Sequence, residues 1–376
     1  MSESVHFAEL PCSDSEHKIA IATLDNAASL NALSLDMLTS LKHQLNKWHD
    51  DDTIICVLLE GAGDKAFCAG GDVRTMHRVM HDSTDAQIED FCTHFFTIEY
   101  QCDYLIHTYC KPIIAWGQGI VMGGGMGLYM GSSHKVVTPS SRLAMPEISI
   151  GLYPDVGGTW FLNRLDDGVG LFLGLTGMMV NAADALQLHL TDHIVLSSGK
   201  ATLLEQLQVA DWDCGDDAYE VVTEMLESLQ MGAEEQAPAT QISRYLSNIQ
   251  TACHGENITQ VVEQIGTLDI SEPWLETAKN NLKQGSPISA HICYRQMIDH
   301  HNLSLADCFR LELTVSVRSA LLGEFREGVR SRLIDKDGDP KWQYKSVAEV
   351  DEHVIEGLFT PLWDDENHPL LQLGHY

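Results

Sequence analysis

The stretch Gly119–Gly131, GIVMGGGMGLYMG, decides the fold: three consecutive glycines interrupt an otherwise apolar run. Glycine inside a helix costs about 0.5–1 kcal/mol relative to alanine, so a triplet needs a physical reason. The run is typical of a strand, a glycine turn and a helix start, where the first N–H groups of the helix have no acceptor within it. The sequence therefore predicts a turn over Gly123–Gly125 whose amides can bind an oxyanion, with a close-packing turn as the alternative.

A second glycine loop has the same layout. The segment KAFCAGGD, residues 65–72, runs from a buried strand through Ala69-Gly70-Gly71 into a helix. Two such loops can direct two backbone N–H groups at one carbonyl oxygen, which stabilises an enolate or a tetrahedral oxyanion. The pair of loops predicts an oxyanion site.

Other common glycine motifs are absent from this sequence. It has no G-x-G-x-x-G dinucleotide fingerprint, no G-x-x-x-x-G-K-[ST] phosphate loop and no G-x-S-x-G hydrolase elbow. His77 and His81 have the i,i+4 spacing of metal ligands but no third ligand nearby, so an exposed helix face is the better interpretation. We expect no metal site.

The first half of the chain alternates strands and helices, which predicts an α/β layer architecture. A helix is expected after Ser34, an N-cap residue, because leucines and Trp48 recur there every three or four positions. Four strands are predicted from short apolar, β-branched runs, at residues 17–24, 53–61, 112–119 and 134–139.

The second half is predicted to be largely helical. From Asn181, itself a predicted helix N-cap, strand patterns nearly vanish, and residues 231–240, MGAEEQAPAT, are the best linker candidate. We expect a core domain over residues 14–200 and a helical C-terminal region over residues 201–376.

Composition limits the possible partners. With 376 residues, 44% hydrophobic, and a formal net charge of −31, the chain is unsuited to nucleic acid or an anionic membrane surface. It has no apolar run of membrane-spanning length, and its N-terminus lacks the pattern of a secretory signal or a transit peptide. Its ten cysteines form no CxxC pair. We therefore expect a cytoplasmic protein with reduced thiols.

The glycine loops KAFCAGGDVRTM and GIVMGGGMGL, together with SLNALSLDM near the N-terminus, resemble the crotonase (enoyl-CoA hydratase/isomerase) superfamily. Within it, residues 142–165, RLAMPEISIGLYPDVGGTWFLNRL, and residues 327–342, EGVRSRLIDKDGDPKW, resemble the 3-hydroxyisobutyryl-CoA hydrolase family. This resemblance implies a crotonase-like fold of repeated ββα units, with stacked sheets surrounded by helices. It also implies hydrolysis of a short β-hydroxyacyl-CoA thioester, as in valine breakdown.

The resemblance also implies roles for particular residues. Gly71 and Gly124 match the two oxyanion-hole amides, and Gly124 also matches a substrate contact. Glu147 in AMPE and Asp155 in PDVGG match the catalytic acids, which also bind substrate, and Glu99 in IEYQCDY matches a substrate-binding glutamate. Coenzyme A enters as part of the substrate, and no metal or redox cofactor is implied.

The residues themselves are compatible with these roles. Glu147 follows a proline in an apolar stretch, so partial desolvation should raise its pKa and strengthen it as a base. Whether it acts as general base or as nucleophile stays open. Asp155 lies in a turn-forming context, either facing the substrate 3-hydroxyl or capping the turn.

Two other functions stay open. Hydratases of this superfamily carry a second glutamate shortly after the glycine triplet, where this chain has Gly127, so enoyl-CoA hydratase or isomerase activity is the weaker alternative. A catalytically degraded acyl-CoA-binding protein is the other. Since members of the superfamily often form trimers or hexamers, a homo-oligomer also stays open.

Overall fold

The computed structural model describes residues 4–13, 16–212 and 217–375, so residue 14, where the predicted core begins, lies outside them. The chain forms two compact units, and each is assembled from three separate segments. Unit 1 contains the chain up to Gly71, Cys102–Leu143 and Val180–Ser243. Unit 2 contains Asp72–Gln101, Ala144–Met179 and Arg244–Tyr376.

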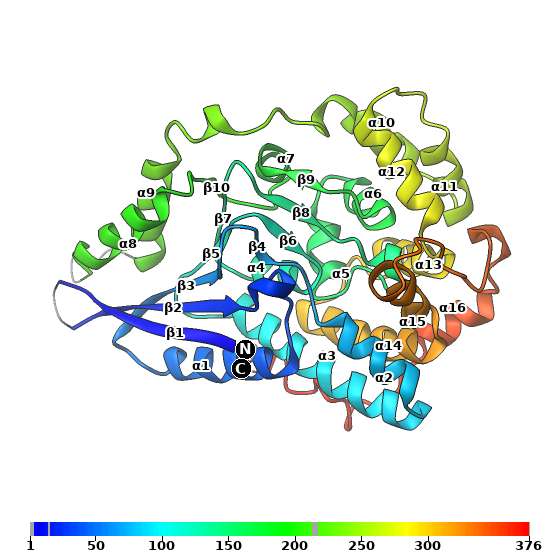
Figure 1. Ribbon diagram of the computed structural model, residues 1–376, viewed down its shortest axis with the longest axis horizontal. Coiled ribbons are helices and arrows are strands. Elements are labelled where there is room, and N and C mark those ends of the chain that lie inside the picture. The colour runs from blue at the N-terminus through cyan, green and yellow to red at the C-terminus, as the bar shows by residue number, and fades with distance from the viewer. Residues whose placement is uncertain (1–3, 14–15, 213–216, 376) are drawn as a thin grey trace. The chain divides into compact units, whose positions relative to one another are not determined.

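Unit 1 is built on two β-sheets (Figure 1). The larger sheet has the order β1-β2-β3-β5-β7-β10, and all of its pairings are parallel except that of β1 with β2. Its strands are β1 (Ser4–Pro11), β2 (Lys18–Asp25), β3 (Ile54–Gly61), β5 (Ile113–Gly117), β7 (His134–Val137) and β10 (His193–Ile194). The smaller sheet has the order β4-β6-β8-β9, with β4 (Ala66–Cys68), β6 (Ile120–Met122), β8 (Arg142–Ala144) and β9 (Val180–Asn181).

Helices cover the larger sheet on both faces, as mostly parallel sheets require. The helices of unit 1 are α1 (Leu35–His49), α4 (Gly124–Met130), α7 (Ala182–Gln187), α8 (Gly199–Val209) and α9 (Ala218–Gln230). Alternate strand residues point to one face, so Cys56 and Leu58 of β3 share a core with Leu203 of α8 and Val222 of α9. Helix α1 packs on β1 and β2, where Trp48 meets Phe7 edge-on at 5.6 Å.

The local predictions for unit 1 are confirmed. All four predicted strands are present, as β2, β3, β5 and β7. Ser34 caps α1 by accepting from the Met37 N–H at 3.2 Å, and Asn181 caps α7 by accepting from the Asp184 N–H at 2.9 Å. Strand β1 was not expected, because its polar, mixed burial pattern at the edge of the sheet gives a weak strand signal.

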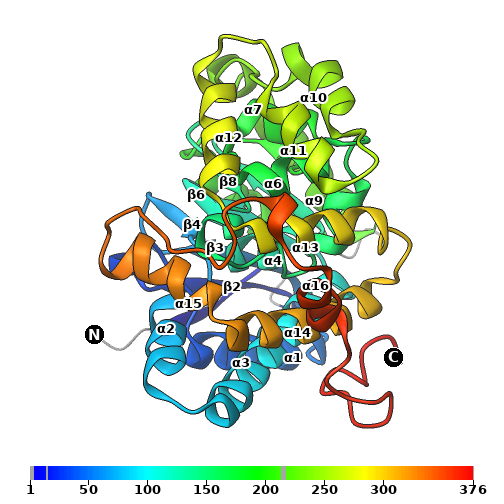
Figure 2. The ribbon, with the colours of Figure 1, turned by 90° about the vertical axis from the view of Figure 1, so that its right-hand side faces the viewer.

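Unit 2 consists of helices in the described residues. They are α2 (Val73–Asp82), α3 (Asp85–His107, which continues into unit 1), α5 (Gly158–Phe161), α6 (Val169–Thr176), α10 (Leu246–Cys253), α11 (Ile258–Gly266), α12 (Pro273–Gln284), α13 (Pro287–Ile298), α14 (Leu305–Leu322), α15 (Glu324–Val329) and α16 (Glu352–Phe359). Helices α3 and α14 lie side by side (Figures 1 and 2), with the ring centroids of Tyr100 and Phe309 5.6 Å apart.

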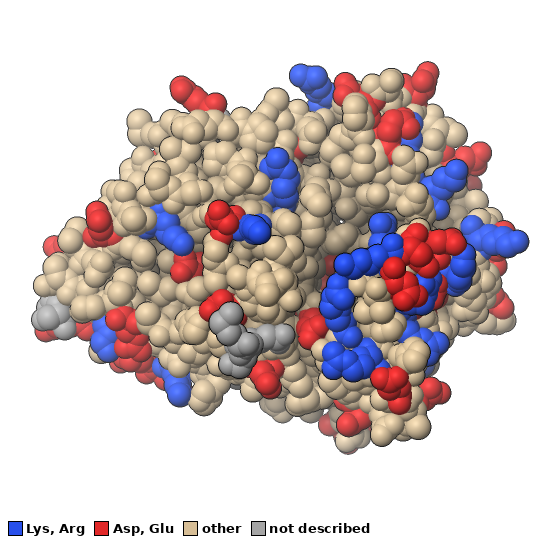
Figure 3. Space-filling view, viewed as in Figure 1, with Lys and Arg blue, Asp and Glu red and all other residues tan. Residues whose placement is uncertain are grey.

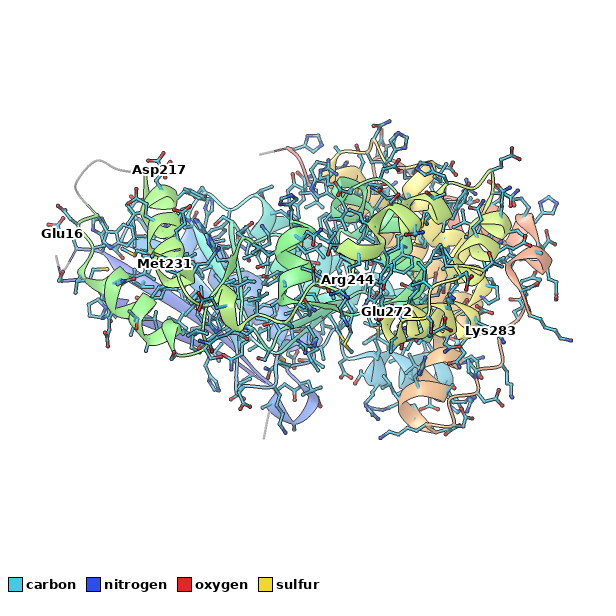
Figure 4. The ribbon with its side chains drawn as sticks, turned by 90° about the horizontal axis from the view of Figure 1, so that it is seen from above. Glu16, Asp217, Met231, Arg244, Glu272 and Lys283 are labelled. Atoms are coloured by element: carbon cyan, nitrogen blue, oxygen red, sulfur yellow. The ribbon has the colours of Figure 1, made fainter. Side chains whose placement is uncertain are left out.

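Helix α12 shows how local sequence sets the ends of these helices. Pro273 occupies the first turn, where its missing N–H is not needed, and Lys283 lies in the last turn, where a cation favours the helix dipole. Glu272 precedes the helix and accepts a hydrogen bond from the Tyr245 hydroxyl at 2.8 Å. Figure 4 labels Glu272 and Lys283 at these two ends.

The domain boundary expected at residue 200 stays a prediction. That position falls within α8 of unit 1, and unit 1 continues to Ser243. The predicted linker, residues 231–240, carries one short 3₁₀ turn over Glu234–Gln236 and ends just before this boundary.

Three further properties concern metals, thiols and membranes. The His77 and His81 rings stack with centroids 6.0 Å apart, and within the described ranges no group of three His, Cys, Asp or Glu side chains is arranged to hold a metal ion. None of the nine cysteines in the described part of the chain is in a disulfide. None of the described helices combines the length and hydrophobicity that a membrane crossing requires.

Candidate active site

The two glycine loops of unit 1 follow neighbouring strands and begin at the same end of the smaller sheet. Strand β4 pairs in parallel with β6, so the carboxyl ends of both strands point the same way. The loop after β4 is held by Leu33, whose N–H donates to the Gly70 carbonyl at 2.8 Å. The loop after β6 turns at Gly123, with φ of 51°, and Gly124 begins α4.

These two loops are in direct contact, and the absence of a side chain at Gly125 is what allows it. A Cβ on Gly70, whose φ is +114°, would lie 3.7 Å from the Gly124 nitrogen. A Cβ on Gly125 would lie 2.4 Å from the Cys68 carbonyl oxygen, which is closer than any side chain can approach. The two loops are therefore packed directly against each other.

Gly71 and Gly124 thus lie on adjoining loops of one unit. Gly71 forms a parallel bridge with Leu33, which fixes the main chain on the N-terminal side of the α2 cap residue Asp72. The Gly124 amide belongs to the first N–H groups of α4, which have no acceptor inside the helix.

The three predicted carboxyl groups all lie in unit 2. Glu147 starts a 3₁₀ turn over Glu147–Ile150, immediately after Pro146. The residue is only 5% exposed, and its Oε2 is buried without a hydrogen-bond partner among the described residues. Burial, with a smaller repulsion from Asp155, raises the pKa of Glu147 well above its ordinary value. Such a carboxyl group is a strong base whenever it is ionised.

Asp155 lies in a sharp turn of unusual backbone. Val156, which follows it, has φ of 51°, and Gly157 has φ of 86°. Asp155 is buried, and its Oδ2 accepts a 2.6 Å hydrogen bond from the Tyr100 hydroxyl of α3. Burial raises the pKa of Asp155 to about 6, although the Tyr100 hydrogen bond acts in the opposite direction.

Glu99 is on α3, directly before Tyr100, and is buried as well. Burial first, and then the charge of Asp155, raise the pKa of Glu99 well above its ordinary value. Since the three carboxyl groups repel one another, they cannot all carry a charge easily. The arrangement suits acid–base chemistry at near-neutral pH.

Several residues around Asp155 were not predicted from the sequence. Tyr100 binds the carboxylate, and Ser316 of α14 lies 2.7 Å from the Tyr100 hydroxyl. Glu312 of α14 accepts hydrogen bonds from the N–H groups of Gly157 and Thr159. The available signal was a glutamate among the apolar residues of FRLELTVSV, residues 309–317, where a buried charge needs a partner.

The chain matches the family model for Enoyl-CoA hydratase/isomerase over residues 19–359. Among curated proteins, it is 34% identical to "3-hydroxyisobutyryl-CoA hydrolase, mitochondrial" of Danio rerio, over 92% of this chain and 88% of that protein. It is 32% identical to the protein of the same name of Homo sapiens, over 96% of this chain and 91% of that protein.

Two solved structures share the fold over nearly the whole chain. An enoyl-CoA hydratase from Rhodobacter sphaeroides 2.4.1 is similar with a TM-score of 0.80 and 27% identity, over 95% of this chain and 97% of that one. A carnitinyl-CoA dehydratase from Mycobacterium thermoresistibile is similar with a TM-score of 0.81 and 28% identity, over 95% and 96%. The crotonase-like fold expected from the motifs is therefore confirmed, and the chain belongs to the enoyl-CoA hydratase/isomerase family.

Proposed function

We propose that this chain is an acyl-CoA thioester hydrolase that converts 3-hydroxyisobutyryl-CoA into 3-hydroxyisobutyrate and coenzyme A. The curated relatives cited above carry that activity in their names, and they match this chain over about nine-tenths of its length. The observation that carries the proposal is Glu147, a buried carboxyl group with one oxygen that has no partner in the described part of the chain. An oxygen of this kind has the capacity to accept a hydrogen bond from a bound water, as a general base does.

The proposed reaction is the hydrolysis of a thioester by one water molecule. Water adds to the thioester carbonyl carbon, the carbon–sulfur bond breaks, and the proton lost by water ends on the coenzyme A sulfur. Glu147 takes that proton as general base, or attacks the carbonyl itself and forms an anhydride that water then opens.

The oxyanion that forms during this step needs hydrogen-bond donors. Gly71 and Gly124, on the adjoining loops of unit 1, are the proposed donors, because backbone amides stabilise the charge without having to reorganise. Removing one such donor typically costs on the order of 10²–10³ in rate.

Asp155 and Glu99 are the proposed partners of the acyl group. A carboxyl group with a pKa of about 6 accepts a hydrogen bond from a substrate 3-hydroxyl group when ionised and donates one when protonated. Glu99, whose pKa is raised by burial and by the charge of Asp155, would bind the same part of the substrate.

Hydration of an enoyl-CoA is the second candidate, since the solved structures cited above are named hydratase and dehydratase. In this chain the position of the second hydratase glutamate is Gly127, which is buried within α4 and offers no acid or base. Water addition across a double bond lacks its second carboxylate, so hydrolysis is favoured.

Two finer expectations remain proposals. A role in valine breakdown follows from the substrate class in the names of the relatives. Cytoplasmic location stays a prediction, and the names of those relatives say mitochondrial.

Glu147→Gln tests the proposal. We expect free-thiol release from 3-hydroxyisobutyryl-CoA to fall by more than about 10³-fold while binding of the thioester is retained, because the amide keeps the shape but cannot accept a proton. Glu220→Gln, at an exposed position in the first turn of α9, is the matched control and should keep full activity. Undiminished hydrolysis by the Glu147→Gln variant would refute the assignment.

The same assay separates the second candidate. Loss of the enoyl absorbance of an unsaturated acyl-CoA, without thiol release from any ester, would identify a hydratase. Neither signal, with tight binding of the esters, would identify a binding protein.

A further inference from the structure

Helix α14 presents a buried polar pair, Glu312 and Ser316, one turn apart in a helix whose other inward residues are mostly apolar. A buried polar group is costly unless it is hydrogen-bonded, so both side chains need a reason to be there. Glu312 accepts hydrogen bonds from the segment that follows Asp155, and Ser316 contacts Tyr100, which binds Asp155.

Glu312 binds the main chain that follows Asp155. Its Oε2 accepts from the Gly157 N–H at 2.8 Å, and its Oε1 accepts from the Thr159 N–H at 2.9 Å. These amides lie at the start of the short helix α5, where no carbonyl of the helix can satisfy them. Both oxygens of one carboxyl group therefore hold the turn after Asp155 in place.

The residue before this turn is anchored to the same helix. The Tyr153 hydroxyl donates to the main-chain carbonyl of Glu312 at 2.7 Å. Gln296 of α13 adds a hydrogen bond to the Pro154 carbonyl at 2.8 Å. Asp155 is thus fixed on both sides, which is what its unusual backbone requires, since Val156 has a positive φ.

Ser316 links two phenols into a chain of hydroxyl groups that ends at Asp155. Its Oγ lies 2.7 Å from the Tyr100 hydroxyl and 2.8 Å from the Tyr153 hydroxyl. The chain therefore runs from Asp155 through Tyr100, Ser316 and Tyr153 to the Glu312 carbonyl.

Counting protons shows that this chain can serve Asp155 in two states. Four oxygen–oxygen contacts share three hydroxyl protons. With Asp155 ionised, Tyr100 donates to the carboxylate, Ser316 can donate to Tyr100, and Tyr153 keeps its hydrogen bond to the Glu312 carbonyl, so two aligned dipoles support the charge. With Asp155 protonated, its proton is the fourth, and every hydroxyl turns to donate away from it, toward the Glu312 carbonyl.

We propose that Glu312 and Ser316 are positioning residues for Asp155. Glu312 holds the backbone of the Asp155 turn, and Ser316 completes a reversible hydroxyl chain that lets this buried carboxyl group exist with or without its proton. The inference rests on the proposed function, in which Asp155 meets the acyl group. The titratable groups that interact with Asp155 are Glu99, Glu147, Glu312, Tyr100 and Tyr153.

The pH profile of thioester hydrolysis tests the role proposed for Ser316. The part of the pH–rate profile that is lost in the Asp155→Asn variant is due to titration of Asp155, and we call it the Asp155 limb. Ser316→Ala removes a group that reinforces donation to the carboxylate, so the midpoint of this limb should move to higher pH, with kcat lower by about 10-fold and KM little changed. Ser319→Ala is the matched control, because Ser319 lies on the same helix, is also buried, and has no hydrogen-bond partner among the described residues.

A double-mutant cycle with Asp155→Asn tests the role proposed for Glu312. Glu312→Gln keeps one acceptor oxygen but places an NH₂ group against a backbone N–H, so kcat should fall by about 10²-fold in the native background. In the Asp155→Asn background the same substitution should cost less than about threefold, since there is no longer a carboxylate to position. Thermal melting identifies any variant that fails to fold, in which case Ser316→Ala decides alone.

The outcomes separate the inference from the function on which it rests. An unmoved limb in Ser316→Ala, or equal losses from Glu312→Gln with and without Asp155, would show that α14 only supports the fold. Full activity in Asp155→Asn, or no thiol release by the unmodified chain, would instead overturn the proposed function.

Discussion

The Tyr100 hydroxyl lies 2.6 Å from Oδ2 of Asp155, so one phenol joins helix α3 to a turn 55 residues further along the chain. Both groups are buried, and burial also raises the pKa of Tyr100 well above its ordinary value. The phenol therefore stays protonated at every physiological pH and donates to the carboxylate whenever Asp155 is ionised.

Tyr100→Phe is expected to raise the pKa of Asp155 above its value of about 6, because it removes a donor that favours the charged form. A hydrogen bond to a charged group is worth about 1.5–3 kcal/mol, which corresponds to about 1–2 pKa units. The midpoint of the Asp155 limb in the pH dependence of kcat should rise by about 1 unit. Tyr109→Phe, which removes a buried hydroxyl that donates to the Leu45 carbonyl, should leave the midpoint unchanged. A Tyr100→Phe profile that superimposes on the native one would contradict the prediction.

Gly125→Ala is expected to lower kcat by about 10²-fold or more. The new Cβ would lie 2.4 Å from the Cys68 carbonyl oxygen, so the two glycine loops must separate and at least one oxyanion donor is displaced. Steady-state thiol release measures the effect, with circular dichroism to confirm the fold. Gly357→Ala, in α16, meets no atom within 4 Å and should be stable and fully active. Native kcat in a folded Gly125→Ala variant would argue against converging loops.

The free energy of unfolding is expected to fall as the pH rises from about 5 to 8. Burial raises the pKa of Glu312 to about 8, although its ordinary value is 4.5, so between these values the native state binds a proton that the unfolded state has lost. Stability falls with pH wherever the native state binds more protons, by an amount on the order of a few kcal/mol for such a shift.

Denaturant titrations of the native chain and of Glu312→Gln across this pH range measure the contribution of Glu312. The variant has no proton to lose at this position, so its stability should depend less steeply on pH. Parallel curves for the two proteins would show that Glu312 titrates alike in the folded and unfolded states.

Arg330 is expected to hold the segment that follows α15. Its guanidinium group donates to Glu327, Asp335 and Asp337 at 2.7–2.9 Å, and Figure 3 shows the acidic and basic side chains gathered over this part of unit 2. Arg330→Lys loses the paired geometry that only a guanidinium group offers, so its melting temperature should fall by about 2–4 °C. Lys341→Ala, which breaks one exposed pair with Asp339, is the control and should melt within about 1 °C of the native chain. Equal melting of Arg330→Lys and the native chain would show that charge alone is sufficient.

Much of the fold could be predicted because its signals are local. The Ser34 and Asn181 caps, the buried strand at residues 53–61 and the glycine turn before Gly124 each depend on neighbours in sequence. Strand β1 could not be predicted in this way, since it is an edge strand whose pairing with β2 makes up for a weak pattern. The interleaving of three segments in each unit was equally inaccessible, because it depends on contacts between distant parts of the chain.

The same division applies to the candidate site. The sequence motifs, through their resemblance to the hydrolase family, gave Gly71, Gly124, Glu147, Asp155 and Glu99 as predicted site residues. Only the tertiary structure showed that these acids share one unit and are buried, and that Tyr100, Ser316 and Glu312 surround Asp155. The physical reason is the distance along the chain over which each property is set. Turns and caps depend on a few neighbouring residues, whereas the pKa of a buried carboxyl group depends on segments as distant as α3 and α14, which exclude water and place other polar groups beside it.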